Sequence, residues 1–230
     1  MYFSKNIKWF GLQGCLYCGS LLRYSDGLCD VCSKDLWSWQ SKSGGLFVQQ
    51  IRKLEVFSLF QWIPGRQEVL SRVIYALKGR NGEEFWKTFA EEFQKRRISE
   101  NVLGLKKPLL FIPSPSKSQS RDHAQLFAKA LLEAGGGDIY NCLLRENSIN
   151  QQKKKSRNQR QRVSLGWAEN FSKHDFPKIS SGKHVIFVDD VVTTGFTARA
   201  AWRTLGKPRD FAVWTLAQRG LSCGASCSLL

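Results

Sequence analysis

The stretch that decides the fold is Val185-Ile186-Phe187-Val188-Asp189-Asp190-Val191-Val192-Thr193-Thr194-Gly195-Phe196-Thr197. Its apolar start predicts a buried strand that delivers two adjacent carboxylates at its carboxyl end. The Thr-Thr-Gly turn then leads directly into a helix, and a helix N-terminus offers backbone amides to an anion. Asp189 and Asp190 can accept hydrogen bonds from sugar hydroxyls, while the turn and Thr197 can hold a phosphate. The stretch predicts a sugar-phosphate site; the alternative is a strand that ends in solvated acids before an ordinary threonine helix cap.

On either side of this stretch, apolar residues alternate between strand-like runs and helical spacing. The strand-like runs are 54–60, 109–112, 140–144, 184–188 and 211–216. Helical faces are formed by Val69, Leu70, Val73, Ile74 and Leu77, by Phe85, Trp86, Phe89, Ala90 and Phe93, by Ala124, Phe127, Ala128 and Leu131, and by Ala198, Ala201, Trp202 and Leu205. This alternation predicts an α/β fold, in which helices lie on the faces of a parallel sheet and the aromatic residues belong to the core.

Seven cysteines are present, and four of them form the pairs Cys15-x-x-Cys18 and Cys29-x-x-Cys32. Paired spacing of this kind lets four thiolates close a tetrahedron around one zinc ion and leaves no position open for a substrate. We therefore expect a structural zinc site; the alternative is a set of buried thiols. The other cysteines are Cys142, Cys223 and Cys227. The first is expected in the core, and the last two in a C-terminal tail rather than in a second metal site.

The polar link Ser41-Lys42-Ser43-Gly44-Gly45 follows the cysteine pairs and is typical of a domain boundary. It predicts a zinc-binding module over residues 1–45 and an α/β domain over residues 46–230.

The chain carries 35 Lys and Arg against 19 Asp and Glu, a formal net charge of +16. Such a field favours polyanions, so a nucleic acid or a phosphorylated ligand is the expected partner. No apolar run approaches the roughly 20 residues that cross a bilayer, and residues 1–10 lack the continuous apolar segment of a secretory signal. We therefore expect a cytoplasmic protein that does not insert into a membrane.

The segment from Arg145 to Arg162 is densely basic, with a single acid. Its cations, besides Arg145 itself, are Lys153, Lys154, Lys155, Arg157, Arg160 and Arg162. They could follow a nucleic-acid backbone, or they could form a hood that closes over a bound pyrophosphate. A solvated surface loop is the third interpretation.

Three further cations, Lys78, Lys117 and Arg121, are expected on turns near the carboxyl ends of strands, where parallel sheets bind ligands. They are candidate pyrophosphate contacts, although each could equally be an ordinary surface cation. The histidines, His123, His174 and His184, share no spacing typical of a catalytic or metal set, and we assign them no role.

The stretch 185–197 resembles the phosphoribosyl-pyrophosphate (PRPP) binding motif of type I phosphoribosyltransferases. This resemblance implies a Rossmann-like phosphoribosyltransferase fold in which Asp189 to Thr197 bind PRPP, with Mg²⁺ bridging pyrophosphate and ribose oxygens. In purine-salvage members an acidic residue that serves the purine stands where this chain has Thr193. The substitution argues against 6-oxopurine salvage.

The order of motifs along nearly the whole chain resembles the ComF family of competence proteins. The motifs are the cysteine pairs, Tyr75-Ala76-Leu77-Lys78-Gly79, Ile112-Pro113-Ser114-Pro115, Arg121 with Gln125, the Gln-, Arg- and Asn-rich segment and the PRPP motif. The resemblance implies a role in natural transformation, in which members handle incoming single-stranded DNA together with the DNA-uptake machinery. Two motifs depart from the family: in one, Ser114 replaces an apolar residue, and in the other, Asp122-His123-Ala124 replaces Gly-Phe-Asn.

Two other functions stay open at this point. A true phosphoribosyltransferase would displace pyrophosphate from PRPP with a nitrogen nucleophile such as a nucleobase, but the sequence assigns no general base. A PRPP-sensing regulator that reads duplex DNA is less favoured, because no helix-turn-helix pattern is present.

Overall fold

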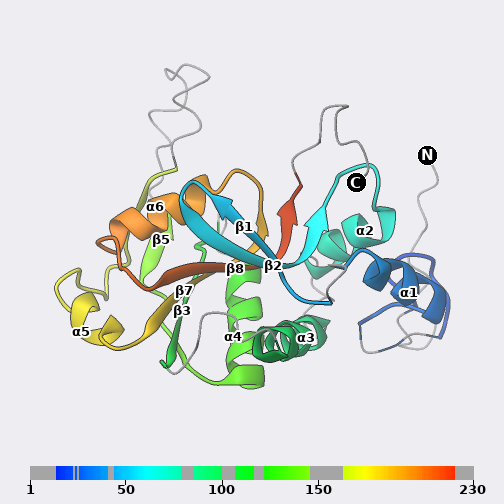
Figure 1. Ribbon diagram of the computed structural model, residues 1–230, viewed down its shortest axis with the longest axis horizontal. Helices are drawn as coiled ribbons and strands as arrows, with labels where there is room; N and C mark the ends of the chain where they lie inside the picture. The colour runs from blue at the N-terminus through cyan, green and yellow to red at the C-terminus, as the bar shows by residue number, and fades with distance from the viewer. Residues whose placement is uncertain are drawn as a thin grey trace, which may run out of the picture.

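The computed structural model describes residues 14–22, 24, 26–40, 44–78, 85–99, 107–116, 122–145 and 163–220 (Figure 1). The strands are β1 (Phe47–Ile51), β2 (Leu54–Trp62), β3 (Leu109–Pro113), β4 (Asp138–Ile139), β5 (Leu143–Arg145), β6 (Leu165–Trp167), β7 (His184–Val192) and β8 (Phe211–Arg219). The helices are α1 (Asp30–Ser38), α2 (Glu68–Leu77), α3 (Phe85–Ser99), α4 (His123–Gly135), α5 (Phe176–Ser180) and α6 (Phe196–Thr204). No helix in these described ranges is long and apolar enough to cross a bilayer.

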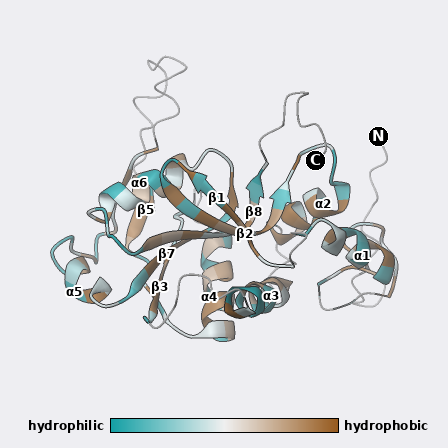
Figure 2. Ribbon diagram, in the orientation of Figure 1, coloured by the Kyte–Doolittle hydropathy of each residue, from teal (hydrophilic) through white to brown (hydrophobic). Residues whose placement is uncertain are grey.

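The main sheet has six strands in the order β1-β2-β8-β7-β3-β4. Each neighbouring pair is parallel except β1 and β2, which form an antiparallel hairpin at one edge. The central strands carry almost continuous apolar runs, as expected for strands covered on both faces, and β7 and β3 are largely brown in Figure 2. The predicted α/β fold with a parallel sheet is therefore confirmed, and the antiparallel edge strand is an addition to it.

Helices cover the two faces of the sheet, and each face has its own buried cluster. Residues of α2, α3 and α4 pack with Phe60, Phe111 and Trp214 on one face. Residues of α5 and α6 pack with Phe187 and Val213 on the other. Figure 1 shows α3 and α4 on the side of the sheet opposite α6. The aromatic residues of α3 are buried, as expected for core residues.

Residues 140–144 do not form the single strand that we expected. The short strand β4 ends at Ile139, and the amide of Cys142 donates to the carbonyl of Tyr140 at 2.9 Å, which turns the chain. The strand β5 then begins at Leu143 and pairs with β6 in a separate two-stranded sheet. The turn thus carries the chain out of the main sheet.

The cysteine-bearing segment packs against the same core as the α/β domain. Leu28 and Leu36 are fully buried in the cluster that contains Phe60 and Phe89. The hydroxyl of Tyr17 also donates to Glu68 at the start of α2, at 2.9 Å. The division at residue 45 stays a prediction, and both apolar packing and this hydrogen bond cross it.

The strand order places a topological switch point between β3 and β7. From β7 the chain passes through α6 to β8 on one side, while from β3 it passes through α4 to β4 on the other. These helices lie on opposite faces of the sheet, so the chain diverges beyond the carboxyl ends of β3 and β7. Open parallel sheets bind ligands in the crevice at such a point.

Candidate functional site

The two adjacent carboxylates predicted from the sequence lie near the carboxyl end of β7, beside the end of β3. Pro113 pairs with Val188 in the sheet, and the amide of Ser114 donates to the carbonyl of Val188 at 2.7 Å. Asp189 and Asp190 follow in β7 and are both partly buried. The carboxylates therefore stand at the switch point.

Asp190 forms an ion pair with Lys78, one of the predicted pyrophosphate contacts. The Lys78 Nζ lies 2.9 Å from a carboxylate oxygen of Asp190. Lys78 is the residue at the C-terminal end of α2, the helix that follows β2. In the sheet β2 is separated from β7 by β8, so α2 brings Lys78 to the end of a strand that is not a neighbour of β2. The other oxygen of Asp190 accepts a hydrogen bond from the Val191 amide at 2.8 Å, and this fixes the carboxylate.

Asp189 sits in an environment that disfavours its negative charge. Burial raises the pKa of Asp189 well above its usual range, and the adjacent charge of Asp190 raises it further. Arg145 opposes this effect from β5, and its Nε donates to the carbonyl of Pro115 at 2.9 Å. Arg145, the first cation of the basic segment, therefore belongs to the same site.

The loop between β7 and α6 has the conformation expected of a turn into a helix N-terminus. Thr193 and Thr194 are exposed, and Gly195 adopts the left-handed conformation with φ 68° directly before α6 begins. Among the described residues, no side chain caps the helix. Successive backbone amides around a left-handed glycine form a concave donor surface that suits an anion.

Two contacts of this site were not predicted. The buried Thr215 in β8 donates its hydroxyl to the carbonyl of Asp190 at 2.9 Å. Arg52, in the turn between β1 and β2, donates to the carbonyl of Thr194 at 2.8 Å. Thr215 lies on the next strand, 25 residues after Asp190, and Arg52 lies 142 residues before Thr194, so neither contact has a local signal in the sequence.

Several predicted site residues lie outside the described residues and keep their predicted roles only as proposals. They are Lys117, Arg121, Lys153, Lys154, Lys155, Arg157, Arg160, Arg162, Cys223 and Cys227. Of the predicted pyrophosphate contacts, Lys78 is therefore the one whose position is described.

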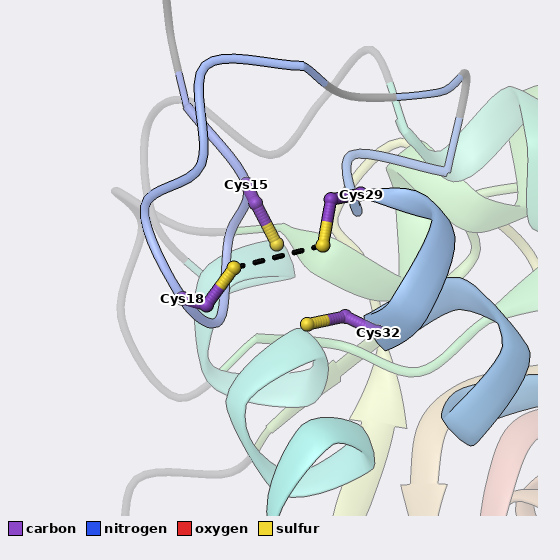
Figure 3. Close-up of side chains that lie close together, drawn as sticks. All are labelled: Cys15, Cys18, Cys29 and Cys32. Carbon is purple, nitrogen blue, oxygen red and sulfur yellow. Dashed lines mark hydrogen bonds between the residues drawn. The ribbon is translucent and has the colours of Figure 1, made fainter.

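The four N-terminal cysteines converge on one point (Figure 3). Their sulfur atoms all lie within 4.8 Å of one another, and the Sγ atoms of Cys18 and Cys29 are 3.6 Å apart. Four sulfurs at about 2.3 Å from a tetrahedral zinc ion would be separated by about 3.8 Å. The predicted cluster is therefore formed, and its donors and size fit a zinc ion.

The thiol pKa values reflect how closely these sulfurs approach. Burial raises the pKa of Cys32, and hydrogen bonds with the neighbouring thiols raise it further. Burial has the same effect at Cys15, but hydrogen bonds from the backbone of Cys18, Cys29 and Tyr17 lower its pKa to about 7. A bound metal ion would displace the protons of these hydrogen-bonded thiols, because the thiolate is the form that binds metal.

Asp26 holds the second cysteine pair in place. Its side chain is buried and accepts three hydrogen bonds: from the Leu28 amide at 3.1 Å, from the Ser33 hydroxyl at 2.6 Å and from the Trp37 indole at 3.0 Å. Leu28 lies directly before Cys29, and Ser33 and Trp37 lie in α1 after Cys32. Asp26 thus connects the cysteine cluster to α1.

Comparison with known proteins gives a distant structural likeness. No family model and no curated protein matches the chain. Among solved structures, a hypoxanthine phosphoribosyl transferase from Trypanosoma cruzi is similar, with 18% identity and a TM-score of 0.38. The match covers 63% of this chain and 72% of that one. A likeness at this level does not carry a function to this chain.

Proposed function

We propose that this chain is a ComF-like cytoplasmic protein of natural transformation, which binds PRPP and single-stranded DNA and acts with the DNA-uptake machinery. The domain of residues 46–230 would resemble type I phosphoribosyltransferases in its ligand as well as in its fold, and the zinc module would be structural.

The observation that carries the PRPP part is the meeting of Asp189, Asp190, Lys78 and the Thr193–Gly195 loop at the switch point of the sheet. In this proposal the carboxylates accept hydrogen bonds from the ribose hydroxyls, and the loop with Thr197 binds the 5-phosphate. Lys78 leaves its ion pair with Asp190 and binds the pyrophosphate, which Lys117 and Arg121 also contact. The carboxylates also suit Mg²⁺, which would supply charge neutralisation when bound with PRPP.

The test of this part is PRPP binding by the double variant Asp189→Asn, Asp190→Asn. Both changes keep the side-chain size and remove the charge, so calorimetry should detect PRPP binding to the wild type and none to the variant. Circular dichroism should report an unchanged fold. Asp138→Asn, at an exposed ion pair with Lys183, is the matched control and should bind PRPP normally. Unchanged affinity in the double variant would refute the proposal.

The DNA part rests on the net charge of +16 and on the basic segment that follows Arg145. Cations that neutralise phosphates release counterions, so binding should weaken steeply with salt. We expect anisotropy of a labelled single-stranded oligonucleotide to report this dependence. Replacing Lys153, Lys154 and Lys155 with Gln should weaken binding and flatten the salt dependence. No binding at low salt would remove DNA from the proposal.

The alternative is an active phosphoribosyltransferase, and the environment of Asp189 favours it. Burial raises the pKa of Asp189, and a buried carboxyl with a raised pKa is a candidate general acid or base. Release of pyrophosphate from PRPP in the presence of one nucleobase from a panel would support this function. Absence of release with every base, despite PRPP binding, would favour the binding protein.

A further inference from the structure

The turn between β1 and β2 has an unusual backbone for its residues. Ile51 pairs with Leu54, which leaves Arg52 and Lys53 as a two-residue turn. Their φ angles are 54° and 65°, both left-handed. Two-residue hairpin turns of this kind favour Asn-Gly, since a side chain disfavours left-handed backbone. Contacts made by these side chains are therefore expected to compensate.

Arg52 makes such contacts, with the loop before α6 and with the first residue of α6. Its Nε donates to the Thr194 carbonyl at 2.8 Å, and its guanidinium lies 3.5 Å from the ring centre of Phe196. Among the described residues no acidic side chain forms an ion pair with it. In Figure 1 the turn lies beside the start of α6.

The side chain of Ile51, the last residue of β1, also lies close to the backbone of Gly195. A Cβ built on Gly195 would lie 2.6 Å from Cγ2 of Ile51, so only glycine fits there without displacing the Ile51 side chain. The loop and the start of α6 are thus contacted from one side by a hydrogen bond to the Thr194 carbonyl, a cation contact with the Phe196 ring and the Ile51 side chain against Gly195. The hairpin, although at the edge of the sheet, is part of the same assembly as the loop.

We propose that Arg52 is a positioning residue for the anion-binding loop. It holds the Thr194 carbonyl toward the turn, and in a trans peptide the following amide, that of Gly195, points the opposite way. The amide is thereby directed to the 5-phosphate, and the carbonyl dipole is kept away from that anion. This inference rests on the proposed PRPP site and assigns Arg52 to its sugar-phosphate end rather than its pyrophosphate end.

The test compares three variants of the full chain by calorimetry with PRPP, ribose 5-phosphate and inorganic pyrophosphate as separate probes. Arg52→Ala should weaken ribose 5-phosphate and PRPP binding about tenfold and leave pyrophosphate binding unchanged. Arg52→Lys keeps the charge but loses the flat guanidinium and its Nε, so it should be equally weak. Lys53→Ala removes the same charge from the adjacent left-handed position and should bind like the wild type. Thermal unfolding checks that all variants are folded.

The possible results separate the inference from the proposed function. If the wild type binds none of the probes, both fail. If the wild type binds PRPP and Arg52→Lys binds equally well, charge alone is needed and the positioning role is wrong. Equal weakening by Lys53→Ala, or equal loss of pyrophosphate affinity, would likewise overturn it. Phe196→Leu removes the ring face but keeps an apolar side chain. It should weaken ribose 5-phosphate and PRPP binding less than Arg52→Ala does, and leave pyrophosphate binding unchanged.

Discussion

Asp190 is the residue at which three parts of the chain meet: Lys78 from the end of α2, Thr215 from β8 and its own neighbour Asp189 in β7. The contacts differ in kind. Lys78 forms an ion pair with Asp190, whereas the charge of Asp189 is favoured by the Asp190 amide and by Arg145. The two carboxylates therefore differ in how their charges are compensated, although they are adjacent in the sequence.

The first prediction concerns Asp189→Asn. Because burial raises the folded-state pKa of Asp189 above the unfolded value of about 3.9, ionisation of this carboxyl destabilises the folded state. The destabilisation is absent below about pH 4, grows as pH rises from there to the folded pKa, and stays constant above it. Asp189→Asn should therefore raise Tm at neutral pH, by about 2–4 °C for each kcal/mol of destabilisation that it removes. Below about pH 4 it should leave Tm unchanged.

Thermal unfolding across pH measures this effect, and Asp138→Asn is the control. Asp138 is in an exposed pair with Lys183, for which about 0–1 kcal/mol of stabilisation is expected. Its loss should lower Tm slightly or not at all. A lower Tm for Asp189→Asn at pH 7 would contradict the account of that site.

The second prediction concerns Asp26→Asn in the cysteine segment. An amide group replaces one of the oxygens that accept from Leu28, Ser33 and Trp37. Losing a buried hydrogen bond to a charged acceptor costs about 1.5–3 kcal/mol. The variant should unfold at a lower temperature and release zinc to a chelator faster than the wild type. Asp35→Asn, an exposed acid on α1, should change neither measurement.

At the scale of elements, strong periodicity made β2, β7, α2 and α3 predictable. The edge strand β1 was not predicted, because Gln49 and Gln50 interrupt its apolar pattern and only one of its edges is paired. The turn at Cys142 was not predicted either. It depends on a backbone hydrogen bond, and the apolar residues on both sides of it have the pattern of a continuous strand.

The candidate site divides in the same way. Asp189, Asp190 and Gly195 stand in one continuous motif, and Lys78 could be placed by its position after a strand and a helix. Arg52 could not, because its partner Thr194 lies 142 residues away in the sequence and the contact needs the hairpin to reach across the sheet. Local sequence thus predicts the groups in the motif and Lys78, but not Arg52, which contacts the loop from a distant part of the chain.

The third prediction tests the packing of the hairpin against the loop by comparing two glycines that flank α6. Gly195 and Gly206 both have left-handed φ, 68° and 80°. A Cβ on Gly206 would meet nothing within 4 Å, whereas one on Gly195 would lie 2.6 Å from Ile51. Gly206→Ala should cost about 1 kcal/mol, from the backbone alone, and Gly195→Ala at least about 1 kcal/mol more. Denaturant unfolding measures both, and equal costs would mean that the hairpin does not pack tightly on the loop.

At the scale of the whole molecule, the cysteine segment and the α/β domain share one hydrophobic cluster. Cys15, Cys32 and Leu36 are buried with Phe60 and Phe89, and the indole of Trp37 lies 5.4 Å from the Phe60 ring. The zinc module is therefore expected to unfold together with the sheet. A separate module joined only by a linker would unfold on its own.

The fourth prediction follows from this shared core. Removing the metal with a chelator, or replacing Cys32 with Ser, should lower the Tm of the entire protein in a single cooperative transition. The physical reason is that zinc binding contributes directly to folding free energy, and the segment that it holds covers part of the core of the sheet. Cys142→Ala is the control, because this buried thiol lies in the opposite core and should leave one zinc ion per chain by elemental analysis. Two calorimetric transitions, with the upper one insensitive to chelator, would instead mean that the sheet is stable without the cysteine segment.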